Sequence, residues 1–168
     1  MMDAVEDSII LRDYTSALQG AEKVVSSCVF VTQSMDTHVW EQCVCKRALS
    51  IGMQATYELA LQEHKEPVSR VHGFLSKYFT DFATLPLGMA LIWCKLLRNH
   101  GHDDNAVSVG RNSIAFFATK GDDTALGTLL EILIIQFLIP MKRFSDARQL
   151  LKTWGPHLKS KELFNVEI

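Results

Sequence analysis

Hydrophobic residues fill most positions of residues 125–139, stop at Pro140, and return at intervals of three or four over residues 144–154. The first stretch predicts a helix that is buried on nearly all sides. The second predicts an amphipathic helix that begins near Ser145 and ends at Gly155, because a glycine followed by a proline stops a helix. With a turn around Pro140, the two stretches predict one helical hairpin.

The same spacing of apolar positions recurs along the rest of the chain and predicts further helices. Their apolar stripes lie within residues 17–28, 39–62, 68–79, 87–97 and 106–117. Polar, glycine-containing or proline-containing turns are expected near residues 32–38, 64–67, 81–86, 99–104, 120–124 and 140–144. No window alternates with a period of two residues, so no strands are expected. The predicted fold class is therefore all-α.

Two of the amphipathic helices begin in a similar way. Tyr14 is followed by Ala17, and Phe144 is followed by Ala147. In a stack of helix pairs, we expect the aromatic ring to fill the gap between hairpins and the alanine to let the paired helix approach. The second helices of successive pairs begin near residues 15, 68, 104 and 144, and the last two intervals, about 36–40 residues, are typical of helix-pair repeats.

These patterns predict stacked antiparallel helix pairs, a TPR-like α-solenoid of about seven to eight helices. A single helical-repeat domain is expected over residues 1–160, and residues 161–168 are expected to begin a linker or a truncated tail. A chain of 168 residues has room for one such domain.

Several single residues carry local predictions. Asp13 is a candidate helix cap, and Pro67 suits the first position of a helix. Gly52 lies inside a predicted helix, where it costs about 1 kcal/mol relative to alanine, so it is expected to let another helix come close. Pro140 should bias Ile139 away from helical geometry.

Composition narrows the possible functions. The chain is 48% apolar and carries 17 basic and 19 acidic residues, interspersed, with a net charge of −2. Without a basic stripe, a primary role in binding nucleic acid is not expected.

The acidic amino terminus has no signal-peptide character, so the chain is expected to be soluble, with its four cysteines as reduced thiols. Residues 125–139 are too short to span a bilayer and include Glu131 and Gln136.

Candidate chemistry is sparse. His100, Gly101, His102, Asp103 and Asp104 could suggest a metal site, but glycine and aspartates at this spacing are more typical of a helix stop and start. Nucleotide-binding and hydrolase motifs are missing from the sequence. We therefore predict a non-enzymatic protein with no catalytic, cofactor-binding or metal-ligating residue, and partner-binding residues remain unassigned.

Two acidic positions are expected to have structural roles. Asp122 and Asp123 should cap a helix and complement its dipole. Glu131 lies in the helix expected to be buried, and a buried acid needs a partner. Arg148 or Lys142 of the same hairpin is the expected partner.

Four segments carry a resemblance to a known family: DYTSALQGAEKVV, WEQCVCKRALSIGMQA, LPLGMALIWCKLL and LGTLLEILIIQFLIPMKRFSDARQLL. Over residues 3–155, their order resembles that of the tail-anchored peroxisomal AAA-ATPase tethers, which include animal peroxin twenty-six and plant aberrant peroxisome morphology protein nine. The resemblance implies a helical adaptor that docks the sixth peroxin and, through it, the first.

By this resemblance, the adaptor holds the ATPase pair at the cytosolic face of the peroxisomal membrane and supports matrix-protein import and peroxisome biogenesis. The family ends in a carboxy-terminal membrane anchor that is not found in this sequence, so a chain that ends at Ile168 is expected in the cytosol. The alternative is a generic helical-repeat subunit of a cytosolic complex, with a different protein partner.

Overall fold

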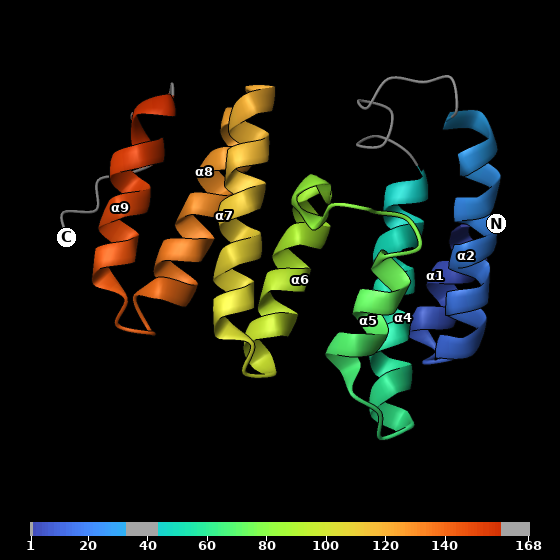
Figure 1. Cartoon of the computed structure of the whole chain (residues 1–168). Coiled ribbons are helices and arrows are strands. Elements are labelled where there is room, and N and C mark those ends of the chain that lie inside the picture. The colour runs from blue at the N-terminus through green and yellow to red at the C-terminus, as the bar shows by residue number, and fades with distance from the viewer. Residues whose placement is uncertain (1, 33–43, 159–168) are drawn as a thin grey trace. The chain divides into compact units, whose positions relative to one another are not determined.

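The computed structural model describes residues 2–32 and 44–158, and side chains 28–32 are not described. Within these ranges the chain forms eight α-helices and no strand, which confirms the all-α prediction (Figure 1). The chain divides into two compact units, residues 1–80 and 81–168. This division does not test the single domain expected over residues 1–160, which stays a prediction. Of the turn expected near 32–38 all but residue 32, the first five residues of the helix expected over 39–62, and the tail expected over 161–168 lie outside the described residues.

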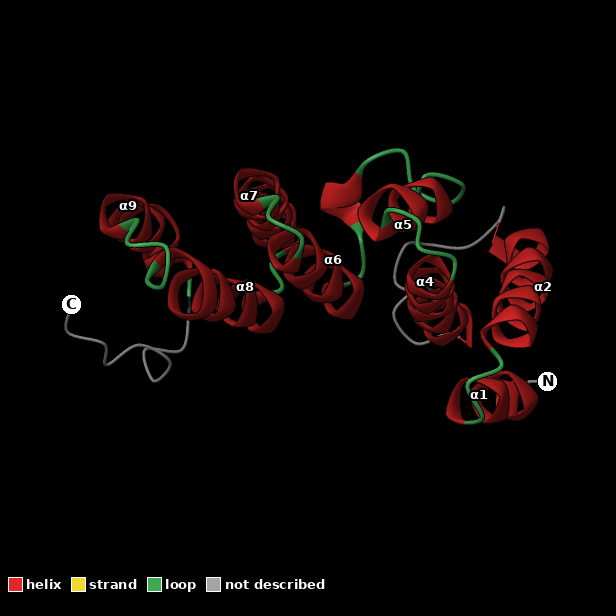
Figure 2. Cartoon of the chain, turned by 90° about the horizontal axis from the view of Figure 1, so that it is seen from below, coloured by secondary structure: helices red, strands yellow, loops and turns green. Residues whose placement is uncertain are grey.

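The first unit contains α1 (Met2–Ile10), α2 (Tyr14–Thr32), α4 (Val44–Gln62) and α5 (Pro67–Leu75). α2 packs along α4, α1 contacts both, and α5 covers another side of α4 (Figure 2). At Gly52 in α4, an added Cβ would lie 2.5 Å from Cζ of Phe74 in α5 and 3.4 Å from Cβ of Ala21 in α2. The expected close approach of helices at Gly52 is therefore confirmed.

Helix ends in the first unit mostly follow the predictions. The Asp13 carboxylate accepts a hydrogen bond from the Ser16 amide at 3.1 Å, and Pro67 stands at the start of α5 with Glu66 as its cap. The helix expected over residues 68–79 was predicted too long, because α5 ends at Leu75. Beyond it, the amides of residues 77 and 78 bond three residues back, which tightens the chain into a turn.

The second unit begins with a 3₁₀ turn, η1 (Phe82–Thr84), and continues through α6 (Leu87–Asn99), α7 (Asp103–Lys120) and α8 (Asp123–Glu131). The last hairpin consists of α8, the π-helix η2 (Ile132–Leu138) and α9 (Phe144–Trp154), followed by η3 (Gly155–His157). α6 contacts α8, and α7 contacts α6 and α8. Figure 2 shows α6 and α8 in one row of this unit, with α7 and α9 in the other.

Glycines end two helices of the second unit. Gly101 has φ +78° after α6, and Gly121 has φ +70° after α7. This left-handed geometry suits glycine, which has no Cβ to clash with the backbone. Asp122 then caps α8, because its carboxylate accepts a hydrogen bond from the Ala125 amide at 2.9 Å. The turns expected at 99–104 and 120–124 are confirmed.

The helix expected over residues 125–139 differs from its prediction in three ways. From Ile132 to Leu138 it widens to a π-helix. Ile139 keeps helical angles, φ −64° and ψ −51°, so the expected bias before Pro140 is wrong. Ile135 is 42% exposed, and Glu131 and Gln136 are exposed as well, so one side of the helix is open.

Glu131 therefore needs no buried partner. None of the ion pairs in the described ranges joins it to Arg148 or Lys142, and that prediction is wrong. Across residues 2–32 and 44–158, none of the helices is long and apolar enough to cross a bilayer.

The cysteines divide into two cases. Cys94 is a buried free thiol in α6, as expected, and burial raises its pKa to about 12. Cys45 is disulfide-bonded, so the expectation of a reduced thiol is wrong at this position. The side chains of Cys28 and Cys43 lie outside the described residues.

Candidate protein-interaction surface

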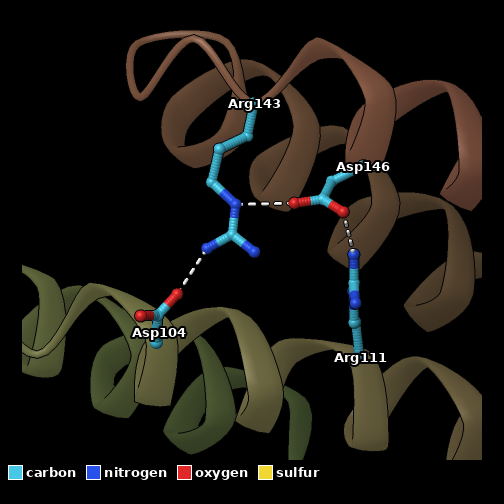
Figure 3. A network of polar contacts seen from close by, with 4 residues as sticks. All are labelled: Asp104, Arg111, Arg143 and Asp146. Carbon is cyan, nitrogen blue, oxygen red and sulfur yellow. Dashed lines mark hydrogen bonds and ion pairs between the residues drawn. The ribbon is translucent and has the colours of Figure 1, made fainter.

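Four charged side chains join α7 to the start of α9 (Figure 3). The Arg143 guanidinium donates through Nε to Oδ2 of Asp146 and through Nη1 to Oδ1 of Asp104, both at 2.6 Å. Nη2 of Arg111 lies 3.0 Å from Oδ1 of Asp146. The Asp146 carboxylate is thus shared by one arginine from α7 and one from the turn before α9. We refer to Asp104, Arg111, Arg143 and Asp146 as the α7–α9 cluster.

Electrostatics in the α7–α9 cluster favour a structural role. The hydrogen bond from Arg143 is the main cause that lowers the pKa of Asp146, and Arg111 lowers it further. A carboxylate with a lowered pKa is a poor proton acceptor at neutral pH. Asp146 also lies in the first turn of α9, where its negative charge complements the helix dipole. The cluster therefore fixes the start of α9 against α7.

A second polar contact joins α6 to η2. Pro140 has no amide hydrogen to donate to the carbonyl oxygen of Gln136, four residues earlier. The Arg98 guanidinium, from α6, donates to that oxygen instead. The same guanidinium carbon lies 5.2 Å from the centroid of the Phe137 ring, within the range of a cation–π interaction. Arg98 therefore satisfies the carbonyl group that Pro140 leaves unpaired.

The shared helix start at Tyr14 and Phe144 is only partly as expected. Ala17 and Ala147 are both buried, which fits their predicted role of allowing close packing. Tyr14 is half-buried. Phe144, however, is 47% exposed, so its ring does not fill a gap between hairpins. That part of the prediction is wrong, and Phe144 becomes a candidate contact residue.

Other large apolar side chains are also exposed. Ile92 on α6 and Ile135 on η2 are each more than two-fifths exposed in the second unit. Ile10 and Leu11, at the turn between α1 and α2, are the most exposed apolar residues of the first. Single exposed apolar residues are normal on a protein surface, so exposure alone does not identify a binding site.

The residues that could suggest metal or acid–base chemistry lie in helix ends. Residues 100–102 form the turn between α6 and α7, and Asp122 is a helix cap. Among the described side chains, no group of three or more histidines, cysteines or acids is arranged to hold a metal ion. Asp104 takes part in the α7–α9 cluster, which sequence reasoning missed. A possible signal was Arg143 beside Asp146 at the predicted helix start.

Known proteins do not identify a family for this chain. Comparison with protein-family models, curated proteins and solved structures finds no significant match. The resemblance to the peroxisomal AAA-ATPase tethers therefore stays a prediction. It depends on the order of the predicted helices and on the four segments quoted above.

Proposed function

We propose that this chain is a non-enzymatic adaptor that recruits the peroxisomal AAA-ATPase pair, the first and sixth peroxins, to the cytosolic face of the peroxisomal membrane. In this role it supports matrix-protein import and peroxisome biogenesis. The partner and the location come from the family resemblance. The packing of helices in the second unit supports the scaffold part of the proposal.

The observation that carries the scaffold proposal is the similar sequence offset of the contacts between the two hairpins of the second unit. Arg98 of α6 contacts residue 136 of η2, and the two are 38 positions apart. Asp104 of α7 contacts Arg143 at the start of α9, and these are 39 positions apart. With Arg111 and Asp146, which are 35 positions apart, the contacts between the two hairpins span offsets of 35 to 39, within the range of helix-pair repeats. These offsets support a TPR-like α-solenoid.

Stacked helix pairs suit an adaptor because each pair buries its own core against its neighbours and leaves a continuous outer surface for partners. The core of the second unit is largely apolar, with Leu126, Leu130, Ile134 and Leu138 almost fully buried. Surface substitutions can therefore change partner choice without disturbing the fold.

The proposal is tested by co-elution of the purified full chain with the sixth peroxin, the first peroxin and both together, each with ATP and with ADP. We expect a complex with the sixth peroxin and a ternary complex that includes the first. Leu133→Pro serves as a misfolded control, because a proline inside the last hairpin costs about 3 kcal/mol or more.

Absence of any complex under all these nucleotide conditions would overturn the adaptor proposal. If the chain instead co-purifies with an unrelated cytosolic assembly, and its loss leaves matrix-protein import unchanged, it is a generic helical-repeat subunit. A failure to bind the ATPases is meaningful only if the chain is folded, so the helical content of each sample is measured by circular dichroism.

A further inference from the structure

The outward side of α9 combines an aromatic ring with two cations. Phe144, Arg148 and Lys152 are all exposed. They are spaced four residues apart, so they follow one face of the helix over about 12 Å. Lys142, in the turn just before α9, is exposed as well. We refer to Lys142, Phe144, Arg148 and Lys152 as the α9 basic face.

This face has no neutralising acid within α9. Asp146 is the only acidic residue of the helix, and both of its oxygens are engaged by Arg111 and Arg143. Across the described part of the chain, no ion pair involves Lys142, Arg148 or Lys152. The positive charge on this side of α9 is therefore available to a negatively charged partner.

We propose that the α9 basic face docks an acidic helical segment of a partner protein, one that also places an apolar residue against Phe144. This inference deepens the adaptor proposal and rests on it. An aromatic ring beside an arginine is a combination enriched at protein–protein interfaces. Acidic side chains on adjacent turns of the segment would meet Arg148 and Lys152, since neighbouring turns are spaced alike in two helices.

The observations favour a protein segment over an anionic membrane surface. An interfacial helix needs a wide apolar face that enters the lipid. In α9 the apolar positions Ala147 and Leu150 are already buried within the second unit, and Leu151 and Trp154 are half-buried. Phe144 is therefore the one exposed apolar side chain of this helix, too little for a wide apolar face. The α7–α9 cluster also holds the start of the helix, so the basic face is presented on a rigid support.

The two chemical parts of the face should act differently. Exposed cations chiefly steer association and make it sensitive to salt, whereas a ring that becomes buried on binding slows dissociation. Binding should therefore weaken as the salt concentration rises above 0.15 M, roughly the physiological ionic strength. The contribution of Phe144 should persist at higher salt.

The test uses the full chain and a fluorescein-labelled acidic amphipathic peptide of about 20 residues, long enough to form a helix. When the peptide is helical, its glutamates line one face and its leucines line the adjacent face. Binding is followed by fluorescence anisotropy at physiological salt. We expect Arg148→Glu/Lys152→Glu to weaken binding about tenfold or more, and Phe144→Ala to weaken it about fivefold.

A matched control reverses the same amount of charge elsewhere. Lys23→Glu/Lys95→Glu changes two exposed lysines that form no ion pair in the described ranges. It should bind the peptide with nearly wild-type affinity. Equal weakening by the control would show that only net charge matters and would overturn the proposal, as would a peptide that does not bind the wild-type chain.

Phosphatidylserine vesicles are tested in parallel by co-sedimentation. Wild-type binding to the vesicles without binding to the peptide would overturn the proposal in favour of a membrane surface. The peptide-binding test and the ATPase-binding test can fail independently of each other. A wild-type chain that binds both ATPases but not the peptide refutes only the α9 basic face, and one that binds the peptide but neither ATPase refutes only the adaptor role.

Discussion

Gly52→Ala provides a direct test of how α4 packs against its neighbours. The new methyl group would lie 2.5 Å from Cζ and 3.0 Å from Cε2 of Phe74, well inside the 3.5–4.0 Å of an ordinary carbon contact. The Phe74 ring is buried and packs edge-on against Tyr78, with ring centroids 5.4 Å apart. It therefore has little room to move, and overpacking of this kind costs about 1–3 kcal/mol.

The intrinsic helix propensity acts in the opposite direction, because alanine is favoured over glycine by about 1 kcal/mol inside a helix. We therefore expect Gly52→Ala to lower the free energy of unfolding by about 1 kcal/mol. Gly73→Ala in α5 is the matched control. No heavy atom lies within 4 Å of its added Cβ, so only the propensity term remains and stability should rise by about 0.5–1 kcal/mol.

Urea unfolding followed by circular dichroism measures both variants. In a Phe74→Leu background, where the smaller side chain leaves room, the cost of Gly52→Ala should largely disappear. If Gly52→Ala is as stable as Gly73→Ala, the ring relaxes freely and the close approach of α4 and α5 does not limit packing. That result would refute the reasoning, because the two substitutions differ only in their surroundings.

Three further outcomes are expected. Arg98→Met should lower the free energy of unfolding by about 0.5–1 kcal/mol in urea titrations, because the exposed carbonyl of Gln136 exchanges a charged donor for water. An unchanged midpoint would contradict this. Because the pKa of Asp146 is lowered in the folded chain, its carboxylate adds to the free energy of unfolding in full above about pH 4, and this contribution is lost as the pH falls through the lowered pKa. Asp146→Asn should therefore lower the free energy of unfolding by about 1 kcal/mol at pH 7 and by much less near pH 2, as measured by urea titration at both pH values. The thiol of Cys94, whose pKa burial raises to about 12, should react with iodoacetamide at pH 8 only after unfolding in urea. Peptide mass spectrometry follows the reaction at Cys94 itself, and rapid alkylation of that residue in the folded chain would show that it is accessible.

Local chemistry made much of the fold predictable. The cap at Asp13, the proline at the start of α5 and the glycine turns at 101 and 121 depend on a few adjacent residues, and the structure confirms each of them. The same holds for the apolar spacing that predicts α6, α7 and α9. These features depend on backbone geometry within one or two turns of helix, which a single sequence displays directly.

Contacts between hairpins could not be predicted in the same way. Arg111 and Asp146 are 35 positions apart, and either could have faced solvent until the pairing of α7 with α9 was known. The exposure of Phe144 is a similar case. Its spacing relative to Ala147 indicates a helix start, but only the position of the neighbouring helix decides whether the ring is covered.

Pro140 shows how a local rule and a distant contact combine. A proline at this position removes one amide donor, and its ring would clash with the carbonyl of residue 136 in a regular α-helix. The sequence therefore predicted a break at Ile139. Instead, the helix widens before the proline, and the amide of Ile139 bonds to the carbonyl of Ile134, five residues earlier, at 3.0 Å.

The widened helix leaves the Gln136 carbonyl without a donor in its own backbone, and Arg98 supplies one from α6 in the preceding hairpin. The backbone bond that the proline removes from one helix is thus replaced by a side chain from another, at an offset of 38 residues, close to the 39 between Asp104 and Arg143. Because the carbonyl lies on the exposed side of η2, water can replace Arg98, but only the observed alignment of the two hairpins gives it a charged protein donor. The proline that was expected only to end a helix therefore also helps to set the stacking of the second unit.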